Sequence, residues 1–367
     1  MTIGADLQGM ADESGLHIDD LLNRLADLGG SDLHLTSGTE PVARIHGELK
    51  RLTEYPRLDN AQIRRLLSGI LTPRHRERFE QDQELDLSYG VPHLGRFRVN
   101  VFFQRGSVGA VMRAVPTEIR SLEDLGHPPV VTTLSEYPRG LVLVTGPTGS
   151  GKSTTLASLI DIINTQKSLH IMTVEDPIEF LHRHKNSIVN QREVGEDTKS
   201  FSDALRHVLR QDPDVILVGE LRDLDTIKTA ITAAETGHLV FATIHTQDAP
   251  QAVDRIIDVF PAHQQAQIRA QLSTSLMAVV TQQLLPRSSR IGRTVASEVM
   301  IVTSAIRNLI REGKTHQIIS AMQAGGHYGM QTMDQSLAQL VRAGTISLEM
   351  ANERCANPED LRRLLGR

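Results

Sequence analysis

The spacing of apolar residues changes along the chain, and the change divides it into parts. From 16 to 116, two stretches of helical spacing, 18–28 and 60–80, are interleaved with short strand-like runs. These runs predict strands at 32–35, 42–45, 84–89, 96–104 and 108–115. Helices beside strands joined by short turns predict a small α+β domain with an antiparallel sheet.

The pattern after residue 116 predicts a linker and a second, larger domain. Residues 117–138 are rich in proline and predict a surface connector. Apolar runs then alternate with helical stretches, which predicts strands at 141–145, 170–174, 215–218 and 239–243, with helices at 153–165, 201–210 and 225–236. This alternation favours an α/β domain with a mostly parallel sheet, and after about residue 262 the pattern favours helices. The predicted parts are a tail (1–15), an α+β domain (16–116), a linker (117–138) and an α/β domain (139–367).

The stretch with the clearest chemical meaning lies between the first of these strands and its helix. Residues 146–153 fit the phosphate-binding pattern G-x-x-x-x-G-K-[ST] in the strand–loop–helix context that it requires. Glycines let backbone N–H groups turn toward phosphates, and the helix N-terminus adds partial positive charge. We expect Lys152 to reach the terminal phosphates of ATP and Ser153 to help hold Mg²⁺. The predicted nucleotide-binding residues are Gly146, Pro147, Thr148, Gly149, Ser150, Gly151, Lys152, Ser153 and Thr154.

Acidic residues and a histidine follow three of the predicted strands, at the edge where ligands collect in parallel sheets. Glu175 and Asp176 follow the second strand, and Glu220 follows the apolar run 215–218 as a Walker-B-like acid and magnesium partner. His245 comes after the next strand, where it can hydrogen-bond a γ-phosphate. The alternatives are a solvated acidic turn, an acid at a helix N-terminus and a structural histidine.

Arginines of the first domain are a further candidate for phosphate contact. Alternation along a strand places Arg96 and Arg98 on one face, and Arg113 lies on the next predicted strand. The alternative is that these arginines face solvent and contact no phosphate, as surface arginines usually do. An arginine supplied by another domain or subunit can raise a hydrolysis rate by about 10³–10⁵.

Composition excludes several other classes. The 367 residues favour two domains, and 40% hydrophobic with 23% charged residues is typical of globular proteins. The single cysteine, Cys355, excludes an internal disulfide and a multi-cysteine zinc site. A net charge of −5 and 3% aromatic residues argue against direct nucleic-acid binding. No apolar run approaches the roughly 18 residues of a membrane span and the start is polar, so we expect a cytoplasmic protein.

Four stretches together resemble the secretion-superfamily (GspE/PulE-like) ATPases. They are the phosphate loop, an Asp box at 174–179, a Walker B stretch at 218–223 and a His box at 237–246. Three more are similar to the PilT-type ATPases of type IV pilus retraction (twitching motility), namely 30–35, 190–195 and above all 305–312. The resemblance runs from about residue 16 to the C-terminal helices. The single cysteine departs from pilus-assembly and type II secretion members, which usually carry a four-cysteine metal site.

The resemblance implies a PAS-like first domain, a RecA-like second domain with a helical C-terminal part, and a homohexameric ring with ATP at domain and subunit boundaries. Carried over by position, Glu175 polarises the attacking water and Glu220 is the magnesium partner. Arg98 and Arg113 reach the γ-phosphate, and Arg222 is a boundary arginine.

The implied function is an ATPase motor that powers pilus retraction and hence twitching motility. Residues 305–312 would form a helix needed for retraction, with Ile306, Leu309 and Ile310 on one side and Arg307 more exposed. Implied partners are an inner-membrane pilus platform protein and an accessory retraction ATPase, at the cytoplasmic face of the inner membrane at the pilus base. The alternatives are a nucleic-acid-translocating RecA-like ATPase and a nucleotide-dependent switch.

Overall fold

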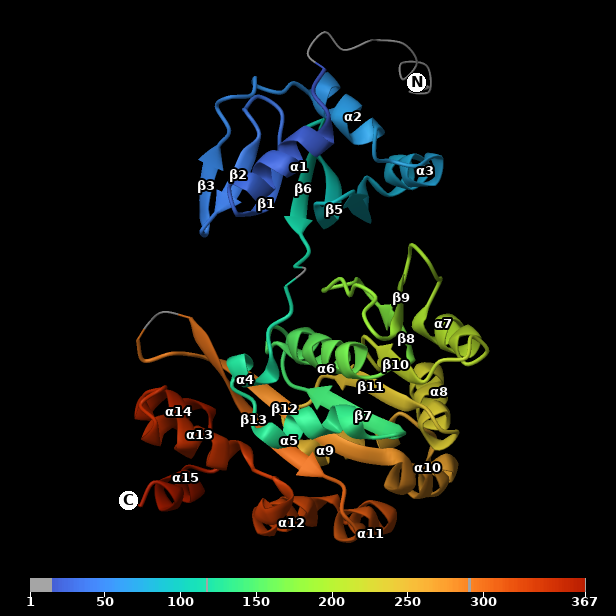
Figure 1. Cartoon of the computed structure of the whole chain (residues 1–367), viewed down its shortest axis with the longest axis vertical. Helices are drawn as coiled ribbons and strands as arrows, with labels where there is room; N and C mark the ends of the chain where they lie inside the picture. The colour runs from blue at the N-terminus through green and yellow to red at the C-terminus, as the bar shows by residue number, and fades with distance from the viewer. Residues whose placement is uncertain (1–14, 117, 290–291, 367) are drawn as a thin grey trace. The chain divides into compact units, whose positions relative to one another are not determined.

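The computed structural model describes residues 15–116, 118–289 and 292–366, so the predicted tail lies almost wholly outside the described residues. The chain divides into two compact units, Met1–Pro116 and Thr117–Arg367 (Figure 1). Within the described residues, no helix combines the length and the apolar character that crossing a membrane requires.

The first unit is built on a six-stranded antiparallel sheet in the order β3-β2-β1-β6-β5-β4 (Figure 1). The strands are β1 (Gly30–Leu35), β2 (Val42–Ile45), β3 (Glu48–Arg51), β4 (Glu84–Val91), β5 (Gly95–Gln104) and β6 (Ser107–Ala114). The helices are α1 (Ile18–Asp27), α2 (Asn60–Ser68) and α3 (Pro73–Asp82). The helical stretch predicted at 60–80 is therefore two helices, because Pro73 starts a new one with Thr72 as its N-cap.

The second unit is built on a seven-stranded sheet in the order β13-β12-β7-β11-β10-β8-β9 (Figure 1). All neighbours are parallel except β12 and β13. Its strands are β7 (Gly140–Thr145), β8 (His170–Glu175), β9 (Ile188–Glu193), β10 (Val215–Val218), β11 (Leu239–Ile244), β12 (Leu276–Pro286) and β13 (Arg293–Ile301). Every residue of β7, β10 and β11 is buried, as continuously apolar central strands require.

Helices cover both faces of this sheet. One buried cluster joins the sheet to α6 (Lys152–Gln166), α4 (Leu122–Leu125), α5 (Pro129–Thr133) and the 3₁₀ helix η1 (Leu134–Glu136). The other joins it to α7 (Phe201–Val208), α8 (Leu224–Glu235), α9 (Ala249–Asp258) and α10 (Ala262–Ser275). Residues 117–138 thus belong to the second unit: Leu122, Val131 and Leu134 are buried in its core.

The prediction of a helical chain after residue 262 is wrong in part. Strands β12 and β13 extend the sheet there, and polar residues such as Thr281 and Gln282 are buried in β12, so its apolar run is broken. Helices complete the chain: α11 (Ser304–Glu312), η2 (Thr315–Gln317), α12 (Ile318–Ala324), η3 (Gly326–Tyr328), α13 (Met333–Arg342), α14 (Leu348–Arg354) and α15 (Pro358–Leu364). The predicted α/β class of the second unit and the α+β class of the first are confirmed.

Candidate active site

The phosphate-binding loop connects β7 to α6, and its glycines have backbone conformations that other residues rarely adopt. Gly146, Gly149 and Gly151 have φ values of +135°, +77° and +91°. A Cβ atom at Gly146 would lie 2.3 Å from the carbonyl oxygen of Gln282, so a side chain there is excluded twice. The loop therefore wraps closely, with its backbone and the α6 N-terminus available to an anion.

Lys152 lies in the concave side of this loop. Its Nζ donates to the carbonyl oxygens of Gly146 (3.0 Å) and Pro147 (3.1 Å), and it lies 3.4 Å from Nδ1 of His245. Burial lowers the pKa of Lys152, and the Glu220 carboxylate opposes this. A phosphate group would give this ammonium a charged acceptor in place of two neutral carbonyls.

Ser150 provides a second indication of a ligand. Its Oγ is buried and has no hydrogen-bond partner among the described residues. Buried polar atoms are normally paired, so an unpaired hydroxyl in a loop of glycines is suited to an anion. The loop fits the nucleotide that the sequence predicts.

Glu220 lies just beyond β10 and interacts with the side chains of Arg222 and His245. Nη2 of Arg222 is 2.8 Å from its Oε2, and Nε2 of His245 is 3.3 Å from its Oε1. Partial burial raises the pKa of Glu220, but the hydrogen bond and charge of Arg222, with His245, outweigh it and lower the pKa below its usual value. Glu220 is thus held ionised, as a magnesium partner must be.

His245 bridges the loop lysine and this carboxylate. An ammonium can only donate, so Nδ1 of His245 accepts from Lys152 and the ring proton lies on Nε2, toward Glu220. The phosphate loop, the Walker B stretch and the His box predicted from sequence therefore meet at the carboxyl ends of β7, β10 and β11.

Glu175 ends β8, and two side chains bind one of its carboxylate oxygens. The hydroxyl of Thr173 donates to Oε1 at 2.6 Å, and Nε2 of Gln191 donates to the same oxygen at 3.1 Å. Burial raises the pKa of Glu175, and these two donors oppose it. A carboxyl group with a raised pKa, at the same edge of the sheet as the phosphate loop, is suited to accepting a proton from water.

Thr173 and Gln191 are functional candidates that the sequence analysis missed. Thr173 is two residues before Glu175 on the same strand, so its side chain points to the same face, and this spacing could have revealed it. Gln191 lies on β9, which was not predicted, although it falls in the stretch 190–195 on which the resemblance partly rests.

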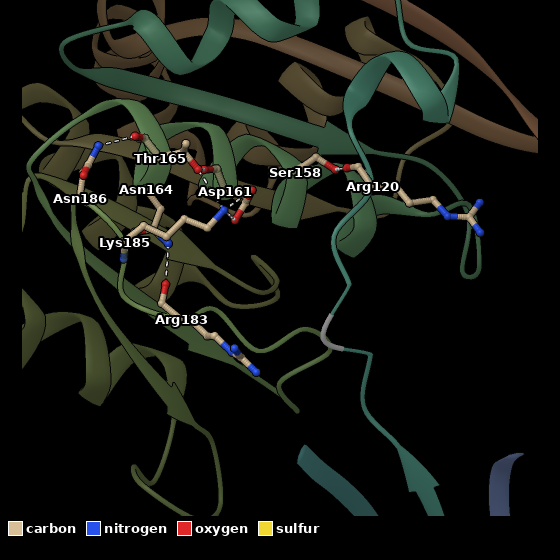
Figure 2. Close-up of polar contacts among 8 residues, drawn as sticks. All are labelled: Arg120, Ser158, Asp161, Asn164, Thr165, Arg183, Lys185 and Asn186. Carbon is tan, nitrogen blue, oxygen red and sulfur yellow. Dashed lines mark hydrogen bonds and ion pairs between the residues drawn. The ribbon is translucent and has the colours of Figure 1, made fainter. Parts of the chain in front are cut away.

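The loop that follows Glu175 is hydrogen-bonded to the C-terminal half of α6 (Figure 2). Nδ2 of Asn164 donates to the Arg183 carbonyl (2.7 Å), and Nζ of Lys185 lies 2.7 Å from Oδ1 of Asp161. These contacts connect the helix that begins in the phosphate loop with the segment that carries Glu175.

The two candidate arginines of the first unit lie opposite each other. Arg98 on β5 and Arg113 on β6 are register partners, so their side chains share a face of the sheet. Nε of Arg113 lies 2.7 Å from Oδ1 of Asp32, which is 4% exposed, while the Arg113 side chain is 65% exposed. This contact uses Nε of Arg113, and the guanidinium has further N–H donors on its two Nη atoms.

Helix α11 carries the stretch 305–312. Ile306 and Ile310 are fully buried, as its amphipathic pattern predicts. Arg307 is only partly exposed, because it donates to the Thr274 carbonyl at 3.2 Å, whereas Arg311 is exposed.

Comparison with known proteins identifies the family of the chain. A family model described as a type II/IV secretion system protein matches residues 17–353. A Pseudomonas aeruginosa protein named as the type IV pilus retraction ATPase PilT is 51% identical over 345 residues, covering 94% of this chain and 100% of that protein. A Neisseria gonorrhoeae twitching motility protein is 47% identical, covering 92% of this chain and 91% of its own length.

Solved structures show the same similarity. A crystal structure of a pilus retraction motor, PilT, with bound ADP has a TM-score of 0.88 and 51% identity, covering 95% of this chain and 99% of that one. The Legionella pneumophila ATPase DotB has a TM-score of 0.80 and 28% identity, covering 91% and 94%. The predicted resemblance to PilT-type ATPases is confirmed. The chain belongs to the type II/IV secretion system protein family.

Proposed function

We propose that this chain hydrolyses ATP to power the retraction of a type IV pilus, and hence twitching motility. The observation that carries the chemistry is the contact of Lys152 in the phosphate loop with His245, and of His245 with Glu220. The pilus is proposed because relatives 51% and 47% identical, matched over nearly their whole length, are named for retraction and twitching.

Each side chain then has a distinct role. Residues 146–154 hold the phosphates, and Lys152 neutralises their charge. Ser153 and Glu220 would hold Mg²⁺, partly through water, and the ion would supply charge neutralisation at the β- and γ-phosphates. Glu175 orients the attacking water and receives its proton, and His245 hydrogen-bonds the γ-phosphate.

Arginines complete the site when ATP is bound. Arg98 and Arg113 approach the γ-phosphate from the first unit, and Arg222 acts at a subunit boundary. The closed state must be favoured by ATP for a cycle of closure and reopening to do work. Nε of Arg113 is held by Asp32, and a guanidinium has further N–H donors, so Arg113 can add a phosphate as a second anionic partner and thereby favour the closed state.

The assembly is proposed to be a homohexameric ring at the cytoplasmic face of the inner membrane, beneath a pilus platform protein and beside an accessory retraction ATPase. Helix α11 is the proposed element of retraction. Its apolar side is buried in the core, so a partner would contact its exposed residues, such as Arg311.

The test is the substitution Glu175→Gln. It should preserve ATP binding and abolish phosphate release, and Lys152→Ala should lose both. Glu123→Gln, which changes an exposed carboxylate of the same unit, serves as the control. Unchanged hydrolysis by Glu175→Gln would remove its assigned role. In cells, deletion of the gene should leave pili present and stop twitching, whereas loss of the pili themselves would indicate an assembly motor.

A further inference from the structure

A buried glutamine lies directly behind the phosphate loop. Strand β12 runs parallel to β7, with Thr281 paired to Thr145 and their hydroxyls 2.8 Å apart. Thr145 is the last residue before Gly146, so the next residue of β12, Gln282, is placed beside the start of the loop. Gln282 is completely buried.

Both polar ends of the Gln282 side chain are used. Nε2 donates to the carbonyl oxygen of Ser150 at 2.8 Å, and Oε1 accepts from the hydroxyl of Thr155 at 2.9 Å. A carbonyl can only accept, so the amino group of Gln282 must face Ser150, and its oxygen must face Thr155. The amide is therefore fixed in one orientation between the loop and α6.

This bond sets the direction of a loop amide. In a planar trans peptide, the C=O of one residue and the N–H of the next point in opposite directions. Holding the Ser150 carbonyl toward β12 therefore turns the N–H of Gly151 away from β12, into the loop. A carbonyl turned inward would instead repel an anion.

Gly146 and Gly151, the first and last glycines of the loop, leave no room for a side chain beside Gln282. A Cβ at Gly146 would lie 2.3 Å from the Gln282 carbonyl oxygen, and one at Gly151 would lie 3.2 Å from Nε2 of Gln282. The first and last glycines of the phosphate-binding pattern thus give β12 room to approach, in addition to their role in the turn.

The hydrogen bonds continue to the segment that follows the first unit. Nε2 of His127 lies 2.9 Å from the Thr155 hydroxyl, and that hydroxyl already donates to Gln282, so His127 is the donor. Burial lowers the pKa of His127 to about 4, so the ring is neutral with its proton on Nε2. The Ser158 hydroxyl donates to the Arg120 carbonyl at 2.7 Å, which is a second tie of this segment to α6 (Figure 2).

We propose that Gln282 is a positioning residue for nucleotide binding, which holds the phosphate loop in its anion-binding conformation, and that Thr155 and His127 hold Gln282 in turn. The proposal rests on the proposed function only in that the loop binds a phosphate. It gives strand β12 and the segment around His127 a role in nucleotide binding that is separate from the roles of the catalytic residues. If only a fraction of the molecules has the loop in its anion-binding conformation, the apparent affinity for nucleotide falls by that fraction. Binding of a triphosphate restores the conformation.

The test compares Gln282→Met with Gln283→Met. The substituted residues are neighbours of the same type on β12, and Gln283 makes no contact with the loop in the hydrogen bonds of the described chain. In Gln282→Met, the dissociation constant of ADP and the KM for ATP should rise about tenfold, the equivalent of ~1.4 kcal/mol, while kcat stays within about twofold. Gln283→Met should match the unchanged protein. An unchanged ADP affinity in Gln282→Met would overturn the proposal.

Thr155 gives a second test, which also decides if Gln282→Met does not fold. Thr155→Val removes the hydroxyl at nearly constant volume, and Thr155→Ser keeps it. The valine variant should bind ADP more weakly than the serine variant, and equal affinities would overturn the relay. A chain that binds ADP but hydrolyses no ATP would contradict the proposed function and leave this comparison intact.

Discussion

The hydroxyl of Thr173 is predicted to favour the carboxylate form of Glu175, the form that can act as a base. Burial raises the pKa of Glu175, and the donors Thr173 and Gln191 oppose it. Thr173→Val removes the shorter of the two bonds, at 2.6 Å, in a buried strand position where valine is well accepted. The pKa of Glu175 must then rise further, so at a fixed pH fewer molecules carry the carboxylate.

The size of the effect follows from the bond. A hydrogen bond to a charged group is worth about 1.5–3 kcal/mol, which changes the ratio of carboxylate to acid by a factor of ~10–150. The acid limb of the kcat profile should therefore move to higher pH. Below that limb kcat should fall by up to the same factor, and KM for ATP should change little, because Thr173 does not belong to the phosphate loop.

The assay is phosphate release at saturating ATP, measured across pH for Thr173→Val and Thr173→Ser. The serine variant keeps the donor and should follow the unchanged protein. At high pH the valine variant should recover most of its kcat. A loss of kcat that is the same at every pH, or no loss at all, would refute the role given to this hydroxyl.

Three further predictions concern other parts of the second unit. Burial raises the pKa of Glu298 from 4.5 to about 7, so between these pH values the folded chain holds a proton that the unfolded chain has lost. The unfolding temperature should therefore fall as pH rises from about 4.5 to about 7. Thermal melts of Glu298→Gln should show a smaller dependence on pH over this range. Gly146→Ala should abolish ADP binding in titration calorimetry, because its Cβ would lie 2.3 Å from a carbonyl oxygen, whereas Gly90→Ala, with no atom within 4 Å, should not. Glu220→Gln should still bind ATP but need about tenfold more Mg²⁺ for half-maximal turnover, because an amide is a weaker ligand than a carboxylate.

Sequence patterns predicted the fold and the site where the residues that carry the chemistry lie in the same short stretch as the elements that position them. The phosphate loop combines a strand, glycines and a lysine in one stretch, so both its fold and its ligand could be predicted. The positions of Glu175, Glu220 and His245 at strand ends could be predicted for the same reason, since each ends or follows a run that only a buried strand explains. Their convergence at one edge follows from parallel strands.

Contacts between distant segments could not be predicted. Gln282 is 132 residues from Ser150, and as a polar residue it obscured the strand that contains it. His127 lies in a stretch whose prolines suggested a connector, yet it is buried against α6. A buried amide or imidazole has the same sequence signature as an exposed one, so only tertiary structure separates the two.

The central claim is that ATP hydrolysis requires arginines supplied by the first unit, and the double substitution Arg98→Ala with Arg113→Ala in the full chain tests it most directly. ATP affinity and phosphate release should be measured together, with Arg44→Ala, a second arginine near Asp32, as the control. The account predicts ATP affinity within about threefold and turnover lowered by about 10³ or more. Phosphate release at the rate of the unchanged protein would contradict it.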